Sequence, residues 1–191
     1  MTTEPLAVTL LVVSVLDALD VPYAIGGSLA SAWHGISRTT VDSDIIAALQ
    51  LIHVQPFVQA LKDEFYVDEG AMRDAVNRRS SFNLIHLRTM YKVDVFVSKS
   101  RPFDRAQLAN RRLRVVAEDP DRMAFVMGAE DTVLAKLEWY RLGGETSERQ
   151  WQDVLGIVRV QGDRLDWAYM RQQAGSLGVD DLLERLAATK E

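Results

Sequence analysis

The apolar positions near the start of the chain recur at helical spacing. They form one stripe along residues 6–19: Leu6, Leu10, Val13 and Leu16. Thr9, Ser14 and Asp17 interrupt the stretch, which is shorter than the roughly 18 apolar residues needed to span a membrane. It also lacks the preceding Lys or Arg of a secretory signal. We therefore expect a buried first helix and a cytoplasmic protein without a membrane partner.

Strand and helix patterns then alternate up to residue 127. Apolar runs or period-two alternation predict strands at residues 23–25, 38–46, 82–87, 92–97, 112–117 and 123–127. Helical patterns cover residues 29–34, 54–65 and 69–79. In the strand at 92–97, the alternation puts Lys92, Asp94 and Phe96 on one face and three valines on the other.

From residue 129 onward the pattern is helical throughout. Helices are expected at residues 130–142, 148–160, 165–174 and 180–188, with Trp139 and Trp151 at core positions. No Pro/Gly/Ser-rich linker separates the two parts of the chain. The expected fold class is α/β (α+β), a mixed β-sheet flanked by helices. The α/β domain would cover residues 1–128, and a C-terminal helical region at 129–191 would pack on it.

Composition narrows the possible functions. Apolar residues make up 48% and charged residues 26% of the chain, which excludes general disorder. The net charge of −5 argues against broad binding to duplex DNA, which needs a basic surface. The sequence contains no cysteine, so disulfides, thiol catalysis and Cys-based metal sites are excluded.

A glycine pair joins the strand at 23–25 to the following helix. In Gly26-Gly27-Ser28, backbone N–H groups at a helix N-terminus could approach an anion. The alternative is an ordinary turn with a serine cap. The segment is neither a Walker A loop nor a dinucleotide-binding fingerprint.

Carboxylates form the second candidate feature. Asp42 and Asp44, at i and i+2 of a strand, point to the same face, and such a pair of hard oxygen donors suits Mg²⁺ or Mn²⁺. Asp94 lies among apolar strand residues and needs a partner. That partner is either a nearby base such as Lys92 or Arg88, or a metal centre shared with the other two carboxylates.

These features together resemble the nucleotidyltransferase superfamily of the DNA polymerase β type. The match is to its small bacterial members, the minimal nucleotidyltransferases and the AbiEii-type toxins. The residues that carry the resemblance are Ile25-Gly26-Gly27-Ser28, Arg38-Thr39-Thr40-Val41-Asp42-Ser43-Asp44-Ile45 and Val93-Asp94-Val95.

The resemblance implies roles for these residues. The nucleoside triphosphate (NTP) would be bound by five residues: Gly26, Gly27, Ser28, Arg38 and Thr39. Asp42 and Asp44 would ligate Mg²⁺ or Mn²⁺. Asp94 would help to ligate one ion and deprotonate the attacking hydroxyl. In-line displacement at phosphorus needs this positioning and charge neutralisation.

A weaker resemblance covers the helical part. Residues 130–137, Arg141 and residues 151–155 are similar to the downstream segment of AbiEii-type proteins. The similarity implies that Lys136 contacts phosphates and that Asp153 is a catalytic or structural acid. An Arg-Asp pair is usual there, whereas this chain has Gln152 before Asp153. The alternative is an amphipathic helix with solvated charges.

The resemblance leads to two expectations about function. The first is a metal-dependent nucleotidyltransferase that transfers a nucleoside monophosphate from an NTP to an acceptor hydroxyl on a protein, a tRNA or a small molecule. The second is a nucleotidyltransferase-fold binding or regulatory component of a toxin–antitoxin pair, with a cognate partner and little or no catalysis. Three clustered carboxylates favour the enzyme.

Overall fold

The computed structural model describes residues 4–36, 40–117 and 121–190. They form two compact units. The first contains the residues up to Gly26 together with Thr40–Val126, and the second contains Gly27–Ile36 and the residues from Met127 onward. The short segment 27–36 therefore groups with the C-terminal helices, although the sequence pattern assigned it to the α/β part.

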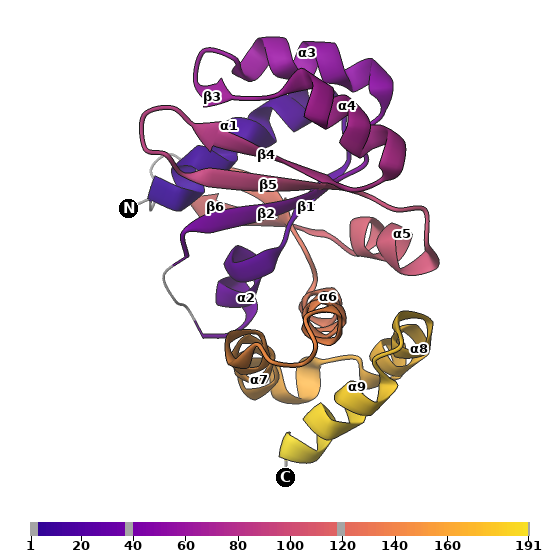
Figure 1. Ribbon diagram of the computed structural model, residues 1–191. Coiled ribbons are helices and arrows are strands. Elements are labelled where there is room, and N and C mark those ends of the chain that lie inside the picture. Colours follow the sequence, from indigo (N-terminus) through magenta and orange to yellow (C-terminus); the bar gives the residue numbers. More distant parts are fainter. Residues whose placement is uncertain (1–3, 37–39, 118–120, 191) are drawn as a thin grey trace. The chain divides into compact units, whose positions relative to one another are not determined.

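The first unit is built on a seven-stranded mixed sheet with the order β3-β4-β5-β2-β1-β7-β6 (Figure 1). Its strands are β1 (Tyr23–Ile25), β2 (Asp42–Ala47), β3 (Phe65–Tyr66), β4 (Ser81–His86), β5 (Lys92–Val97), β6 (Arg112–Ala117) and β7 (Arg122–Val126). The pairs β2–β5 and β1–β7 are parallel, and the other pairs are antiparallel.

Helices cover one face of this sheet. α1 (Glu4–Ala18), α3 (Leu51–Leu61) and α4 (Glu69–Arg78) lie together on that face, and α5 (Pro102–Ala109) follows β5 (Figure 1). The central strands alternate as their sequences predict. Val93, Val95 and Val97 are buried, whereas Lys92, Asp94 and Phe96 are only half-buried. β2 has the same alternation, with its aspartates on the half-buried side.

The second unit is helical. It contains α2 (Gly27–His34), α6 (Ala129–Leu142), α7 (Glu148–Gln161), α8 (Trp167–Leu177) and α9 (Asp180–Ala187), with short 3₁₀ turns at Gly162–Arg164 and Ala188–Lys190. α2 is held to the others by long-range contacts. A Cβ on Gly35 would lie 2.8 Å from the backbone nitrogen of Ile157, so α7 requires glycine there. The Gln161 amide also donates to the His34 carbonyl at 2.6 Å.

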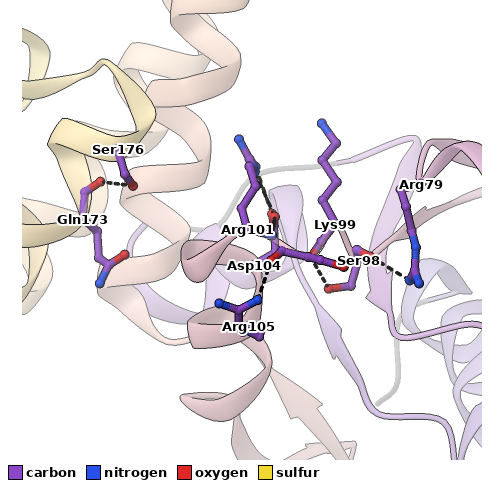
Figure 2. A network of polar contacts seen from close by, with 9 residues as sticks. Arg79, Ser98, Lys99, Arg101, Asp104, Arg105, Gln173 and Ser176 are labelled. Carbon is purple, nitrogen blue, oxygen red and sulfur yellow. Dashed lines mark hydrogen bonds and ion pairs between the residues drawn. The ribbon is translucent and has the colours of Figure 1, made fainter.

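The structure confirms the α/β fold class and most of the predicted elements, with three differences. α5 was not predicted; its signals are Pro102 in the first turn and Asp104, which accepts a hydrogen bond from the Arg101 backbone at 3.2 Å. Figure 2 shows Asp104 beside Arg101 and, at the end of β5, Arg79 reaching the Ser98 carbonyl.

The other two differences concern a helix end and a tryptophan. The helix expected at 54–65 ends at Leu61, and Phe65 belongs to β3 instead. The core position expected for Trp139 is wrong, because this residue is 52% exposed, whereas Trp151 is buried as expected. No helix in the described residues is both long and apolar enough to cross a membrane. Packing of the C-terminal helices on the α/β domain stays a prediction.

Candidate active site

The register of two central strands places three aspartates on one face of the sheet. Asp44 of β2 lies directly opposite Asp94 of β5 in a parallel ladder, and Asp42 lies opposite Lys92. Paired residues on neighbouring strands, about 4.8 Å apart, point to the same side of a sheet. Asp42, Asp44 and Asp94 are all half-buried. The backbone therefore gathers the carboxylates that the sequence singled out.

The same row continues onto the next strand. Asn83 of β4 lies opposite Asp94 in the antiparallel β4–β5 ladder. The side chains of Asn83, Asp94 and Asp44 thus stand side by side across β4, β5 and β2. Sequence reasoning missed Asn83; the two successive strands predicted at residues 82–87 and 92–97 were the available signal.

Lys92 places a positive charge on this face. Its Nζ lies 2.7 Å from Oδ2 of Asp94 in an ion pair whose side chains are 42% and 20% exposed. The hydrogen bond to Asp94 raises the pKa of Lys92 most strongly; desolvation lowers it, and the charges of Asp94, Asp42 and Asp44 raise it. All three carboxylates therefore act electrostatically on this one ammonium group.

A threonine hydroxyl orients the first aspartate. Oγ1 of Thr40 donates to the backbone carbonyl of Asp42 at 2.8 Å and to its Oδ1 at 3.1 Å. Thr40 itself is buried. One side-chain rotamer of Asp42 is thus favoured before any ligand binds.

A hydroxyl chain supports β2 from the opposite, helix-covered face. Thr9 donates to the Pro5 carbonyl at 2.7 Å, and Ser43 contacts Thr9 at 2.5 Å and the Tyr91 hydroxyl at 2.9 Å. Because each hydroxyl has one proton, Ser43 donates to Thr9 and Tyr91 donates to Ser43. Burial raises the pKa of Tyr91, and the charges of Asp42 and Asp44 raise it further. The phenol therefore stays protonated and can donate.

The glycine pair joins this region to α2. The Gly26 backbone N–H donates to the Asp44 carbonyl at 2.8 Å, which fixes the end of β1 beside the second aspartate. Gly27 begins α2 with φ at +54°, a conformation that side chains disfavour. Ser28 is buried in the first turn of that helix. Phosphate binding by Gly26, Gly27 and Ser28 stays a prediction, and Arg38 and Thr39 lie outside the described residues.

Lys136 is a buried member of the second unit. Its Nζ donates to Oδ2 of Asp153 at 2.8 Å and to Oε1 of Gln150 at 3.1 Å. The Lys136 and Asp153 side chains are only 7% and 6% exposed. Lys136 and Asp153 are therefore not solvated charges, whereas Glu148 and Arg149 of α7 are exposed. The predicted contact of Lys136 with phosphates stays a prediction.

The carboxylate face fits a divalent cation by its chemistry and by its backbone register. Carboxylate oxygens are the donors that Mg²⁺ and Mn²⁺ prefer. Within the described ranges, however, no three acidic or histidine side chains stand ready-made around a metal position. The ammonium group of Lys92 lies on Asp94 instead. Asp42, Asp44 and Asp94 would therefore hold the ion only after Asp94 changes its partner.

Comparison with solved structures decides the fold. An antigenic nucleotidyltransferase-like protein from Paracoccidioides brasiliensis aligns with a TM-score of 0.54 and 17% identity, over 83% of this chain and 76% of that one. The solution structure of the antibiotic-resistance factor ANT(2'')-Ia aligns with a TM-score of 0.59 and 12% identity, over 100% of this chain and 97% of that one. Its complex with adenylyl-2''-tobramycin gives a TM-score of 0.54 and 9% identity, over 99% and 100%. This chain has a nucleotidyltransferase fold.

Comparison of the sequence with known families and proteins found no significant match. The fold predicted from Gly26-Gly27-Ser28, Asp42, Asp44 and Asp94 is confirmed. The identities of 9% to 17% establish the fold alone, so the roles of these residues are argued below as proposals.

Proposed function

We propose that this protein is a metal-dependent nucleotidyltransferase that moves a nucleoside monophosphate from an NTP to an acceptor hydroxyl. One observation carries the proposal. Asp44 and Asp94 are in register on adjacent parallel strands, with Asp42 on the same face, within a nucleotidyltransferase fold. Like charges at this spacing repel one another unless a cation lies among them. One lysine does not neutralise three carboxylates, and a divalent ion would supply the remaining positive charge.

Metal binding and the orientation of the metal ligands would fall to different residues. Asp42, Asp44 and Asp94 would hold Mg²⁺ or Mn²⁺, which when bound neutralises charge on the triphosphate. Thr40 keeps Asp42 oriented, and the hydroxyl chain through Ser43 keeps β2 in place behind it.

The side chains of the site would supply the proton acceptor that the transfer step needs. Asp94 would accept the proton of the acceptor hydroxyl, whose oxygen forms a bond to the α-phosphorus. The bond from that phosphorus to the β-phosphate oxygen breaks, and pyrophosphate leaves. The Gly26-Gly27-Ser28 turn would bind the triphosphate through backbone N–H groups.

A small hydroxyl-bearing molecule is the first acceptor class to test. The likeness to ANT(2'')-Ia, whose solved complex contains adenylyl-2''-tobramycin, supports this choice. The other acceptor classes to test are a protein side chain and the 3' end of an RNA. In the metal-bound protein, each would present its hydroxyl to Asp94 in the same way.

The proposal is tested by intact-mass analysis of the acceptors. The purified protein is incubated with each NTP, Mg²⁺ or Mn²⁺, and an acceptor panel of aminoglycosides, RNA and whole-cell protein. We expect one acceptor to gain the mass of a nucleoside monophosphate while pyrophosphate appears. Asp44→Asn should lower the rate at least about a thousandfold, roughly 4 kcal/mol. The matched control Asp63→Asn changes an exposed aspartate after α3 and should leave the rate unchanged.

A different outcome would favour the other function class. If the protein binds NTPs but modifies no acceptor under any of these conditions, it is a binding or regulatory component, as in a toxin–antitoxin pair. Transfer that persists in Asp44→Asn would also contradict the proposal.

A further inference from the structure

Lys92 holds the third aspartate of the candidate site. It lies directly opposite Asp42 in the β2–β5 ladder and bonds Asp94, two residues further along its own strand, at 2.7 Å. The two side chains alternate with buried valines and so share the carboxylate face. The lysine thus stands beside all three acids that the proposed function assigns to a metal.

The ammonium group and a divalent cation compete for the same oxygen. Each stabilises Asp94 by placing positive charge against its carboxylate, and two cations held against one carboxylate repel each other. An ammonium ion is a compact point charge, whereas a divalent ion brings twice the charge and several ligand positions. The stronger cation can therefore displace the lysine.

The Lys92 side chain can move away from Asp94. Its side chain is 42% exposed, so the ammonium group can return to water without being left buried. The flexible four-carbon stem allows the head group to move while the backbone stays in the ladder. Asp94 is 20% exposed and more enclosed, so it is the member of the pair that needs a counter-ion in every state.

We propose that Lys92 is a resident counter-ion that occupies Asp94 in the metal-free protein and is displaced when a divalent metal binds. This inference rests on the proposed function, because it concerns the same carboxylates. It assigns Lys92 a regulatory role: the lysine keeps the acid-rich face intact without metal and sets the concentration at which the metal binds. Lys92 is thus a positioning residue that acts through Asp94.

Direct metal binding without nucleotide tests this role. Binding of Mn²⁺ is measured from the electron paramagnetic resonance of the free ion, and the melting temperature is measured in EDTA and in saturating Mn²⁺. Lys92→Met should bind Mn²⁺ about tenfold more tightly than the wild type, roughly 1.4 kcal/mol. In EDTA it should melt about 2 to 4 °C lower. Saturating Mn²⁺ should remove that difference.

Two further variants separate the local effect from general causes. Lys92→Arg keeps the positive charge and should bind Mn²⁺ no more tightly than the wild type. Lys62→Met removes the charge of an exposed lysine at the end of α3, outside the carboxylate face, and should leave both Mn²⁺ affinity and melting temperature unchanged. Circular dichroism verifies that each variant is folded, and Lys92→Gln replaces Lys92→Met if the latter does not fold.

The outcomes distinguish the inference from the proposed function. If the wild type binds Mn²⁺ and Lys92→Met binds it equally or more weakly, the counter-ion role is wrong while the metal site stands. If no variant binds Mn²⁺, both are wrong. If Lys92→Met binds more tightly but no acceptor is ever modified, the counter-ion role holds and the transferase proposal fails.

Discussion

The buried ion pair between Lys136 and Asp153 predicts a large and asymmetric effect of substitution. The Lys136→Met variant keeps the volume and apolar stem of the side chain but removes the ammonium group. Asp153, 6% exposed, then loses a partner 2.8 Å away. Breaking a buried pair in this way costs about 3 to 5 kcal/mol of unfolding free energy, because the remaining charge is left in a poorly hydrated site.

The double variant should not show this loss of unfolding free energy. In Lys136→Met/Asp153→Leu both charges are replaced by apolar groups, and such replacements are often neutral or stabilising. A surface pair provides the matched control. Arg73 and Glu69 of α4 lie 2.9 Å apart with about half of each side chain exposed, so Arg73→Met should cost less than about 1 kcal/mol.

Calorimetry and denaturant titration measure these differences. For a chain of this length, a loss of about 3 to 5 kcal/mol lowers the melting temperature by about 6 to 20 °C. Wild-type stability of Lys136→Met would contradict this prediction, since it would mean that water or other groups stabilise the Asp153 carboxylate in place of Lys136. A double variant that is as unstable as the single variant would do the same.

The double variant also separates the two readings of Lys136. If stability returns but transfer activity stays at least about tenfold low, Lys136 or Asp153 acts in the transfer step, as the predicted contact of Lys136 with phosphates requires. If activity returns with stability, Lys136 is a structural residue of the second unit.

Three further substitutions test other parts of the structure. Gly35→Ala places a Cβ 2.8 Å from the Ile157 nitrogen and should cost about 1 to 3 kcal/mol in denaturant titration; wild-type stability would show that α7 does not approach this closely. Tyr91→Phe removes the donor to Ser43 and should cost about 1 kcal/mol with the fold retained, whereas an unchanged midpoint would show that the hydroxyl chain adds nothing. Gly27→Val strains a position at φ +54° and blocks close backbone approach, so calorimetric NTP affinity should fall at least about tenfold; full affinity in a folded variant would exclude phosphate binding at this turn.

The central strands were predictable because their signal is local. In β5 three buried valines alternate with Lys92, Asp94 and Phe96, and this period alone fixes which residues share the face of Asp94. The glycine pair after β1 and the spacing of Asp42 and Asp44 are equally local. Together they were enough to predict the nucleotidyltransferase fold.

Features that depend on long-range register were not predictable. That Asp44 stands opposite Asp94, rather than one residue away, follows from how β2 and β5 pair, and a shift of one residue would turn Asp94 to the other face. The pairing of Lys136 with Asp153 joins two helices across 17 residues of sequence, beyond any helical i,i+4 rule. Gly35 gives no sign in the sequence that its neighbour is the backbone of α7.

Transfer of label from the α-phosphorus of an NTP is the most direct test of the proposed nucleotidyltransferase activity. The protein is incubated with Mg²⁺ and an NTP labelled at either the α- or the γ-phosphorus, together with the acceptor found in the mass screen, and wild type is compared with Asp44→Asn and Asp94→Asn. The proposed activity predicts that the wild type transfers α-label but not γ-label to the acceptor and that EDTA abolishes transfer. It also predicts that both variants lose at least about a thousandfold in rate. Transfer of γ-label, transfer in EDTA, or wild-type rates in either variant would contradict it.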